Sequence, residues 1–111
     1  MAKREKTDLL RGTLDLLILK TLTLEPLHGV AIADRIAQVT GGTFRVQAGS
    51  LFPALHRLEA SDLIEGEWTT TPDGRRIKSY ALTSAGKRQL NAETKQWERI
   101  VAAVSQVLQL T

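Results

Sequence analysis

The sequence predicts a mainly α-helical protein with one β-hairpin and a long last helix. Apolar residues recur at three- and four-residue steps in several segments, which is the spacing of an amphipathic helix. Two β-prone runs flank one turn sequence that contains proline and glycine. The chain has 111 residues, 42% of them hydrophobic, so we expect one domain with its own core.

The first helix is expected at residues 9–24. Pro26 ends it, because the residue before a proline is pushed out of the helical region. Residues 1–8 are expected to form a flexible arm. The apolar stripe of the helix consists of Leu10, Leu14, Leu17, Ile18 and Leu22.

A second helix is expected at residues 29–39, where Ile32 and Ile36 lie one turn apart. The pair Gly41-Gly42 ends it, since glycine tolerates a positive φ. The residues that follow, Thr43 to Val46, are β-prone and are expected to form a short strand.

A third helix is expected at residues 48–61, with Leu51, Leu55 and Leu58 pointing inward. Its outer face is then small and polar near its start, as a helix in the major groove of DNA requires. An ordinary surface helix is the alternative, with Phe52 packed in the core. The residues expected to contact DNA here are Gln47, Gly49, Ser50, Phe52, Pro53, His56 and Arg57.

A hairpin follows, with strands at residues 64–70 and 75–82 joined by the turn sequence TPDG. Proline presets φ in such a turn, and glycine accepts the left-handed conformation. Arg76 and Lys78 alternate onto one face and Arg75 joins them near the tip, so we expect phosphate contacts from all three. A charged edge that protects the hairpin from aggregation is the alternative.

The last helix is expected at residues 85–110, capped by Thr83 or Ser84. It carries a heptad-like apolar stripe, and two-fold dimers are the commonest solution for such a stripe when it is exposed. Packing on the first helix is the alternative. The expected dimerisation residues are Leu90, Thr94, Trp97, Ile100, Val101, Val104, Val107 and Leu108. Trp97 either packs in this interface or offers a stacking surface to a planar hydrophobic effector.

This order of elements is that of a winged helix-turn-helix, expected at residues 1–84, with a dimerisation helix at 85–111. The net charge of +3 is a modest indication of nucleic-acid binding, but residues 74–88 hold five basic residues and no acidic one. We therefore expect a transcription regulator that binds double-stranded operator DNA as a homodimer. The alternative is a winged-helix module that binds protein rather than DNA.

Other classes of protein are disfavoured by the composition. The absence of cysteine excludes disulfides and Cys-based metal sites and fits the cytoplasm. The two histidines have no spaced partners and no Gly-rich phosphate loop is present, so we expect no enzyme, metal or cofactor. The apolar run at residues 14–24 is too short and too charged to span a bilayer, so no membrane contact is expected.

Four motifs make the chain resemble the PadR-like transcription regulators, which are bacterial winged-helix proteins. The motifs are GTLDLLIL at residues 12–19, HG at 28–29, GSLFPALHRLE at 49–59 and YALTSAG at 80–86. The family usually has tyrosine where Phe52 stands and often an aromatic residue where Val30 stands.

The resemblance implies a homodimeric repressor of the short-tailed kind, usually released by a small molecule. In some short-tailed members, paired tryptophans on the last helix sandwich flat, hydrophobic compounds, and Trp97 stands where such a tryptophan would be. The sequence also looks similar to a subgroup found beside permease genes.

Overall fold

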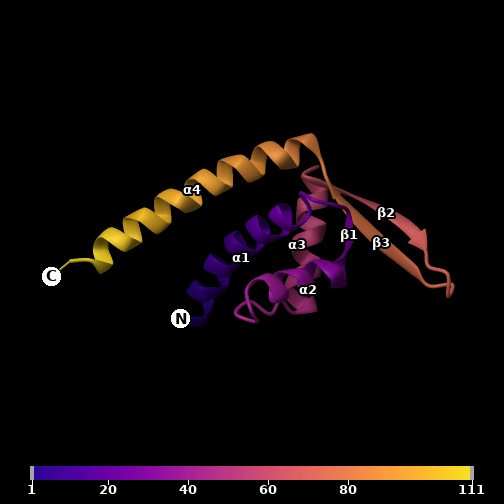
Figure 1. Cartoon of the computed structure of the whole chain (residues 1–111), viewed down its shortest axis with the longest axis horizontal. Helices are drawn as coiled ribbons and strands as arrows, with labels where there is room; N and C mark the ends of the chain where they lie inside the picture. Colours follow the sequence, from indigo (N-terminus) through magenta and orange to yellow (C-terminus); the bar gives the residue numbers. More distant parts are fainter. Residues whose placement is uncertain (1, 111) are drawn as a thin grey trace.

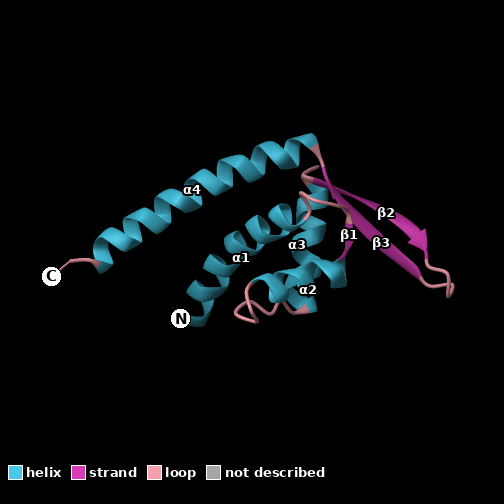
Figure 2. Cartoon of the chain, viewed as in Figure 1, coloured by secondary structure: helices cyan, strands magenta, loops and turns pink. Residues whose placement is uncertain are grey.

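The computed structural model describes residues 2–110, with side chains from residue 12 onward, and has the mainly α architecture predicted (Figure 1). The elements are α1 Ala2–Thr21, β1 Leu27–His28, α2 Gly29–Val39, α3 Ala48–Ala60, β2 Ile64–Thr70, β3 Arg76–Leu82 and α4 Ser84–Leu108. The hairpin of β2 and β3 projects from one end of the helical body, and α4 runs away from it toward the other end (Figure 2).

The sheet has three antiparallel strands in the order β1-β3-β2. The strand predicted from Thr43 to Val46 is wrong, because these residues form a loop whose Phe44 and Val46 pack against the core. The third strand is instead β1, which pairs Leu27 with Tyr80 along the free edge of β3. A two-residue strand that pairs across the fold has no periodicity of its own to reveal it.

The bounds of α1 also differ from the prediction. The helix begins at Ala2, so residues 2–8 continue the helix where an arm was expected, and Met1 lies outside the described residues. It ends at Thr21 rather than Leu24. The Thr21 hydroxyl donates to the Leu17 carbonyl at 2.6 Å, and the chain then turns so that β1 can reach β3.

One apolar core joins the helices to the base of the hairpin. The predicted stripes of α1, α2 and α3 meet in it, while Leu17 is only partly buried and the side chain of Leu10 lies outside the described residues. The largest side chains that are completely buried are Ile18, Leu19, Ile32, Leu51, Leu55 and Ile64.

Two junctions fix the hairpin and α4. In the turn, Gly74 has φ +87°, the left-handed conformation that the sequence predicted. At the start of α4, the Thr83 hydroxyl accepts a hydrogen bond from the Gly86 N–H at 2.9 Å, which confirms the predicted cap. A Cβ atom on Gly86 would collide with the Leu63 carbonyl oxygen, so glycine lets α4 pack closely beside β2.

The molecule is elongated, with principal extents of 60 × 28 × 26 Å. The first part of α4 lies beside α1, and its far end extends past the helical body (Figure 1). The N-terminal part of α4 therefore belongs to the core, and the C-terminal part does not.

Candidate nucleic-acid interface

The helix α3 buries one face and exposes the other. Leu51, Leu55 and Leu58 are buried as predicted, and Ala54 joins them. The residues expected to read DNA all lie exposed on the opposite side or at the helix start; they are Gln47, Gly49, Ser50, Phe52, Pro53, His56 and Arg57.

The start of α3 offers hydrogen-bonding groups to a partner. Gln47 is the N-cap residue, but its side chain makes no capping hydrogen bond, so its amide remains available. Pro53 lies inside the helix and lacks an N–H, so the Gly49 carbonyl does not receive the helical hydrogen bond that residue 53 would otherwise donate. Both features increase the polar character of the exposed face.

Arg57 has a partner that the sequence did not reveal. Its guanidinium lies 2.6 Å from the carboxylate of Asp15 on α1, and its side chain is 41% exposed. The ion pair connects α3 to α1. Arg57 therefore presents the remaining edge of its guanidinium to solvent instead of the whole group.

The three cations of the hairpin differ in their surroundings. Lys78 donates to the Glu59 carboxylate on α3 at 2.8 Å, which lowers the pKa of Glu59 and raises that of Lys78. Arg75 lies 3.2 Å from Asp73 at the tip. Arg76 is the one of the three without a carboxylate partner among the described residues.

The hairpin segregates charge between its two faces. The register pairs Trp68 with Lys78, which places both on the face directed at α3, where Glu59 meets Lys78. Alternation places Glu65 and Glu67 on the opposite face. The face beside α3 is therefore basic, and the outer face is acidic.

Sequence reasoning missed Trp68. The Arg76 guanidinium lies over its indole ring at 5.0 Å from the centroid, and the Lys78 ammonium lies at 5.8 Å. The indole is 55% exposed. Reading both strands in antiparallel register, instead of the second strand alone, would have placed Trp68 beside these cations.

A hollow of about 340 Å³ separates the start of α2, α3 and the hairpin. Phe52 is 40% exposed on its wall, and its ring lies so close to Gly29 that a Cβ atom there would be 2.9 Å from the ring. Phe52 therefore covers the start of α2 and is not part of the buried core. The other lining residues are His28, Val30, His56, Trp68, Arg76, Ile77, Lys78 and Tyr80.

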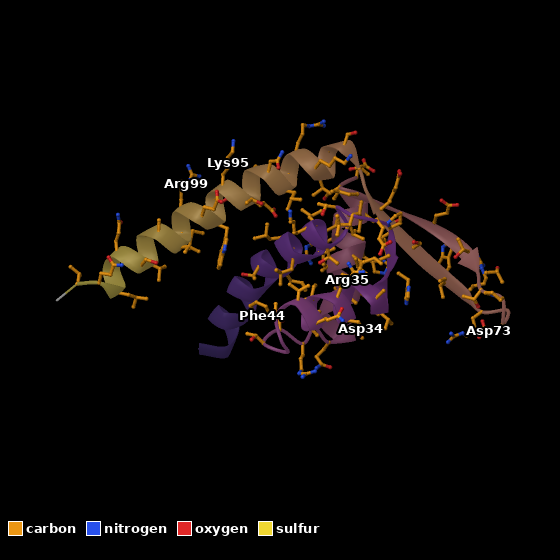
Figure 3. All side chains as sticks on the ribbon, in the orientation of Figure 1. Asp34, Arg35, Phe44, Asp73, Lys95 and Arg99 are labelled. Carbon is orange, nitrogen blue, oxygen red and sulfur yellow. The ribbon has the colours of Figure 1, made fainter. Side chains whose placement is uncertain are left out.

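The stripe of α4 divides between two environments. Leu90 is only 6% exposed and belongs to the core, so its assignment to a dimer interface is corrected: α1 lies beside this part of α4. Thr94 is partly buried and donates its hydroxyl proton to the Leu90 carbonyl. The remaining predicted seam residues are exposed, namely Trp97, Ile100, Val101, Val104, Val107 and Leu108. In Figure 3, Lys95 and Arg99 point away from α1 on the other side of α4.

Within residues 12–110, no group of three or more histidine, aspartate or glutamate side chains is arranged to hold a metal ion. The helices of the described part of the chain include none that is long and apolar enough to cross a membrane.

Comparison with known proteins supports the resemblance noted in the motifs. The model of the family described as "Transcriptional regulator PadR-like family" matches residues 18–92. The transcriptional regulator Rv3488 of Mycobacterium tuberculosis is 31% identical over 94 residues, which cover 85% of this chain and 84% of that protein.

Two solved structures extend the similarity to the whole fold. A PadR family transcriptional regulator from Eggerthella lenta has a TM-score of 0.82 at 29% identity, covering 99% of this chain and 94% of its own. A PadR-like transcriptional regulator from Bacillus cereus has a TM-score of 0.78 at 30% identity, covering 94% and 99%.

Proposed function

Because the chain belongs to the PadR-like family of transcriptional regulators, we propose that it is a homodimeric repressor released from a palindromic operator by a small molecule. Proteins of this family are transcription regulators and not enzymes. Because its proposed partner is chromosomal DNA, we propose that the protein acts in the cytoplasm.

The main support for DNA binding is that α3 and the hairpin together form one basic face. The Lys78–Glu59 ion pair holds the hairpin against α3, and Glu65 and Glu67 lie on the far side of the hairpin. A helix that enters the major groove and a wing that meets the flanking backbone use such a face. We assign DNA contact to Gln47, Gly49, Ser50, Phe52, Pro53, His56, Arg57, Arg75, Arg76 and Lys78.

The exposed part of the α4 stripe supports dimerisation. Six large apolar residues from Trp97 to Leu108 lie exposed along a helix that extends past its own domain. A second copy related by a two-fold axis would bury this stripe against its equivalent. The two copies of α3 would then read half-sites about 34 Å apart, one helical turn of DNA, or a multiple of it.

Trp97 is the proposed effector contact. It is 42% exposed and is the large aromatic residue of the stripe. Near a two-fold axis, two indoles separated by a gap would hold a flat hydrophobic molecule by stacking and apolar burial. Such a ligand releases DNA if it favours a dimer whose α3 helices have the wrong spacing.

Footprinting of the DNA upstream of the chain's own gene tests DNA binding. We expect a protected palindrome and an affinity that falls steeply with salt, since phosphate contacts release counterions. Failure to bind any duplex at low salt would contradict the proposal and favour the protein-binding module.

Titration with planar dyes tests the effector. Quenching of indole fluorescence that persists in Trp68→Phe, disappears in Trp97→Ala and accompanies operator release is the expected result. Unchanged dye affinity and DNA release in a Trp97→Ala dimer would show that Trp97 only packs.

A further inference from the structure

Trp68 lies on the wing, the hairpin of β2 and β3, and its indole is 55% exposed. A single exposed apolar residue requires no explanation on its own. Trp68, however, lies on the hairpin face beside α3, opposite Lys78 in the register, and its ring carries two cations. This combination places an aromatic ring and two cations together on the face proposed to meet DNA.

The indole holds Arg76 in a defined place. The guanidinium lies over the ring at 5.0 Å from the centroid, a distance at which the ring attracts it. A guanidinium placed over a ring can still direct N–H groups to a second partner, and their planar arrangement matches phosphate oxygens. Because Arg76 has no carboxylate partner among the described residues, its guanidinium can bind a phosphate without first breaking an ion pair.

Lys78 is less available for the same purpose. Its ammonium donates to Glu59 at 2.8 Å, and its side chain is only 22% exposed. The pair neutralises part of the positive charge and holds the hairpin against α3. Arg76, supported by Trp68, is therefore the stronger candidate for a phosphate contact on this face.

The surrounding hollow has the shape and chemistry of a backbone contact. It lies between the exposed face of α3 and the wing, and no carboxylate is among the residues that line it. His56, Trp68 and Arg76 supply flat and cationic surfaces. A sugar–phosphate unit presents an apolar sugar face beside an anion, so it complements an indole placed next to a guanidinium.

We propose that Trp68 positions Arg76 for a DNA phosphate and contacts the adjoining deoxyribose, so that this hollow seats one unit of the DNA backbone. This proposal rests on the proposed DNA binding and adds to it Trp68 as a contact residue for the deoxyribose–phosphate backbone. It assigns the wing contact to a pair of side chains that act together.

The test is a double-mutant cycle on binding to a mixed-sequence duplex of roughly 30 base pairs, or about three helical turns. Trp68→Ala should weaken binding roughly 3- to 30-fold, which is the range expected when a cation–π contact to a phosphate-binding cation is lost. It should also lower the salt slope by about one, because Arg76 loses its phosphate. The double variant with Arg76→Ala should bind no more weakly than the weaker single variant.

Three further variants separate contact from folding. Trp68→Phe keeps an aromatic ring, so its affinity should lie between those of the parent and Trp68→Ala. In Trp97→Phe, where Trp68 is the one tryptophan left, DNA binding should still change the indole emission. Thr69→Ala, on the outer face of the wing, should bind as the parent does.

The results separate this inference from the proposed function. If the parent binds no duplex, both are overturned. If the parent binds and Trp68→Ala retains its affinity and salt slope, the inference alone fails. It also fails if DNA binding leaves the indole emission of Trp97→Phe unchanged, because Trp68 is the one tryptophan left in that variant.

Discussion

The helices α3 and α4 both carry an apolar stripe at helical spacing, but the protomer covers only that of α3 along its whole length. In α3 the stripe of Leu51, Leu55 and Leu58 is buried, which leaves a polar face outward. In α4 the stripe starts in the core at Leu90 and then continues uncovered to Leu108. Periodicity thus identifies an apolar face in both helices, and only the fold shows whether its partner lies within the same chain.

This difference assigns different tasks to the two helices. Burial of its apolar face gives α3 a fixed orientation, which a helix needs in order to present donors to base edges. The uncovered part of α4 remains available to a second copy. Breaking each stripe should therefore produce different defects.

The largest effect is expected from Val104→Glu. Val104 is exposed in the protomer, so a carboxylate there leaves the fold intact but would be buried unpaired in the proposed dimer. We expect a monomer whose operator affinity is lower by about 100-fold or more, because two linked half-sites gain their affinity from simultaneous binding. Gel-shift titration and sedimentation measure the two consequences.

Lys95→Glu is the matched control. Lys95 points away from α1 on the other side of α4 (Figure 3), and its replacement changes the charge more than Val104→Glu does. If both variants dissociate the dimer equally, charge and not the stripe is responsible.

Leu90→Ala should damage folding instead of association. Leu90 is buried in the core, so we expect the free energy of unfolding to fall by about 2–5 kcal/mol. Urea denaturation at several protein concentrations checks this. The loss of unfolding free energy in Leu90→Ala should be the same at each protein concentration, whereas the loss in Val104→Ala should depend on it. Equal, concentration-dependent losses in the two variants would remove the distinction between the two parts of α4.

Within the DNA-binding face, Gln47→Ala and Arg76→Ala should differ in kind. Loss of a base contact at Gln47 should reduce discrimination between operator and random DNA by about 1–3 kcal/mol. Loss of Arg76 should weaken binding to both and lower the salt slope by about one. Binding isotherms on both duplexes at several salt concentrations decide it, and identical profiles would contradict the division of roles.

The smallest effect is expected from Glu59→Gln. The hydrogen bond from Lys78 lowers the pKa of Glu59 below its ordinary value of 4.5. Its contribution to stability is therefore present above that value and is lost as the pH falls through the lower, folded-state pKa. The free energy of unfolding should fall less steeply below pH 4.5 in Glu59→Gln than in the parent. If the free energy of unfolding falls equally steeply at acid pH in the two proteins, the Lys78–Glu59 pair contributes nothing to stability.

Much of the fold follows from local patterns. The bounds of α2 and of β2, the cap at Thr83 and the left-handed Gly74 all depend on residues close together in the sequence. The strand β1 does not, since it exists only because Tyr80 and its neighbours offer a free edge. For the same reason, the β-prone pattern at residues 43–46 could not show that β1 already occupies the edge of β3.

The candidate site shows the same limit. Exposure of the α3 face follows from helical spacing, but the partner of Arg57 is Asp15 on another helix. The Lys78–Glu59 pair likewise joins separate elements. The burial of Leu90 depends on where α1 lies, which its heptad position does not reveal.

Sedimentation equilibrium of the full chain at micromolar concentration tests the central claim, that a second copy covers the exposed stripe of α4. The account predicts twice the 12.2 kDa of one chain, and one chain's mass for Val104→Glu. A parent protein that sediments at 12.2 kDa while binding its operator with full affinity would contradict it.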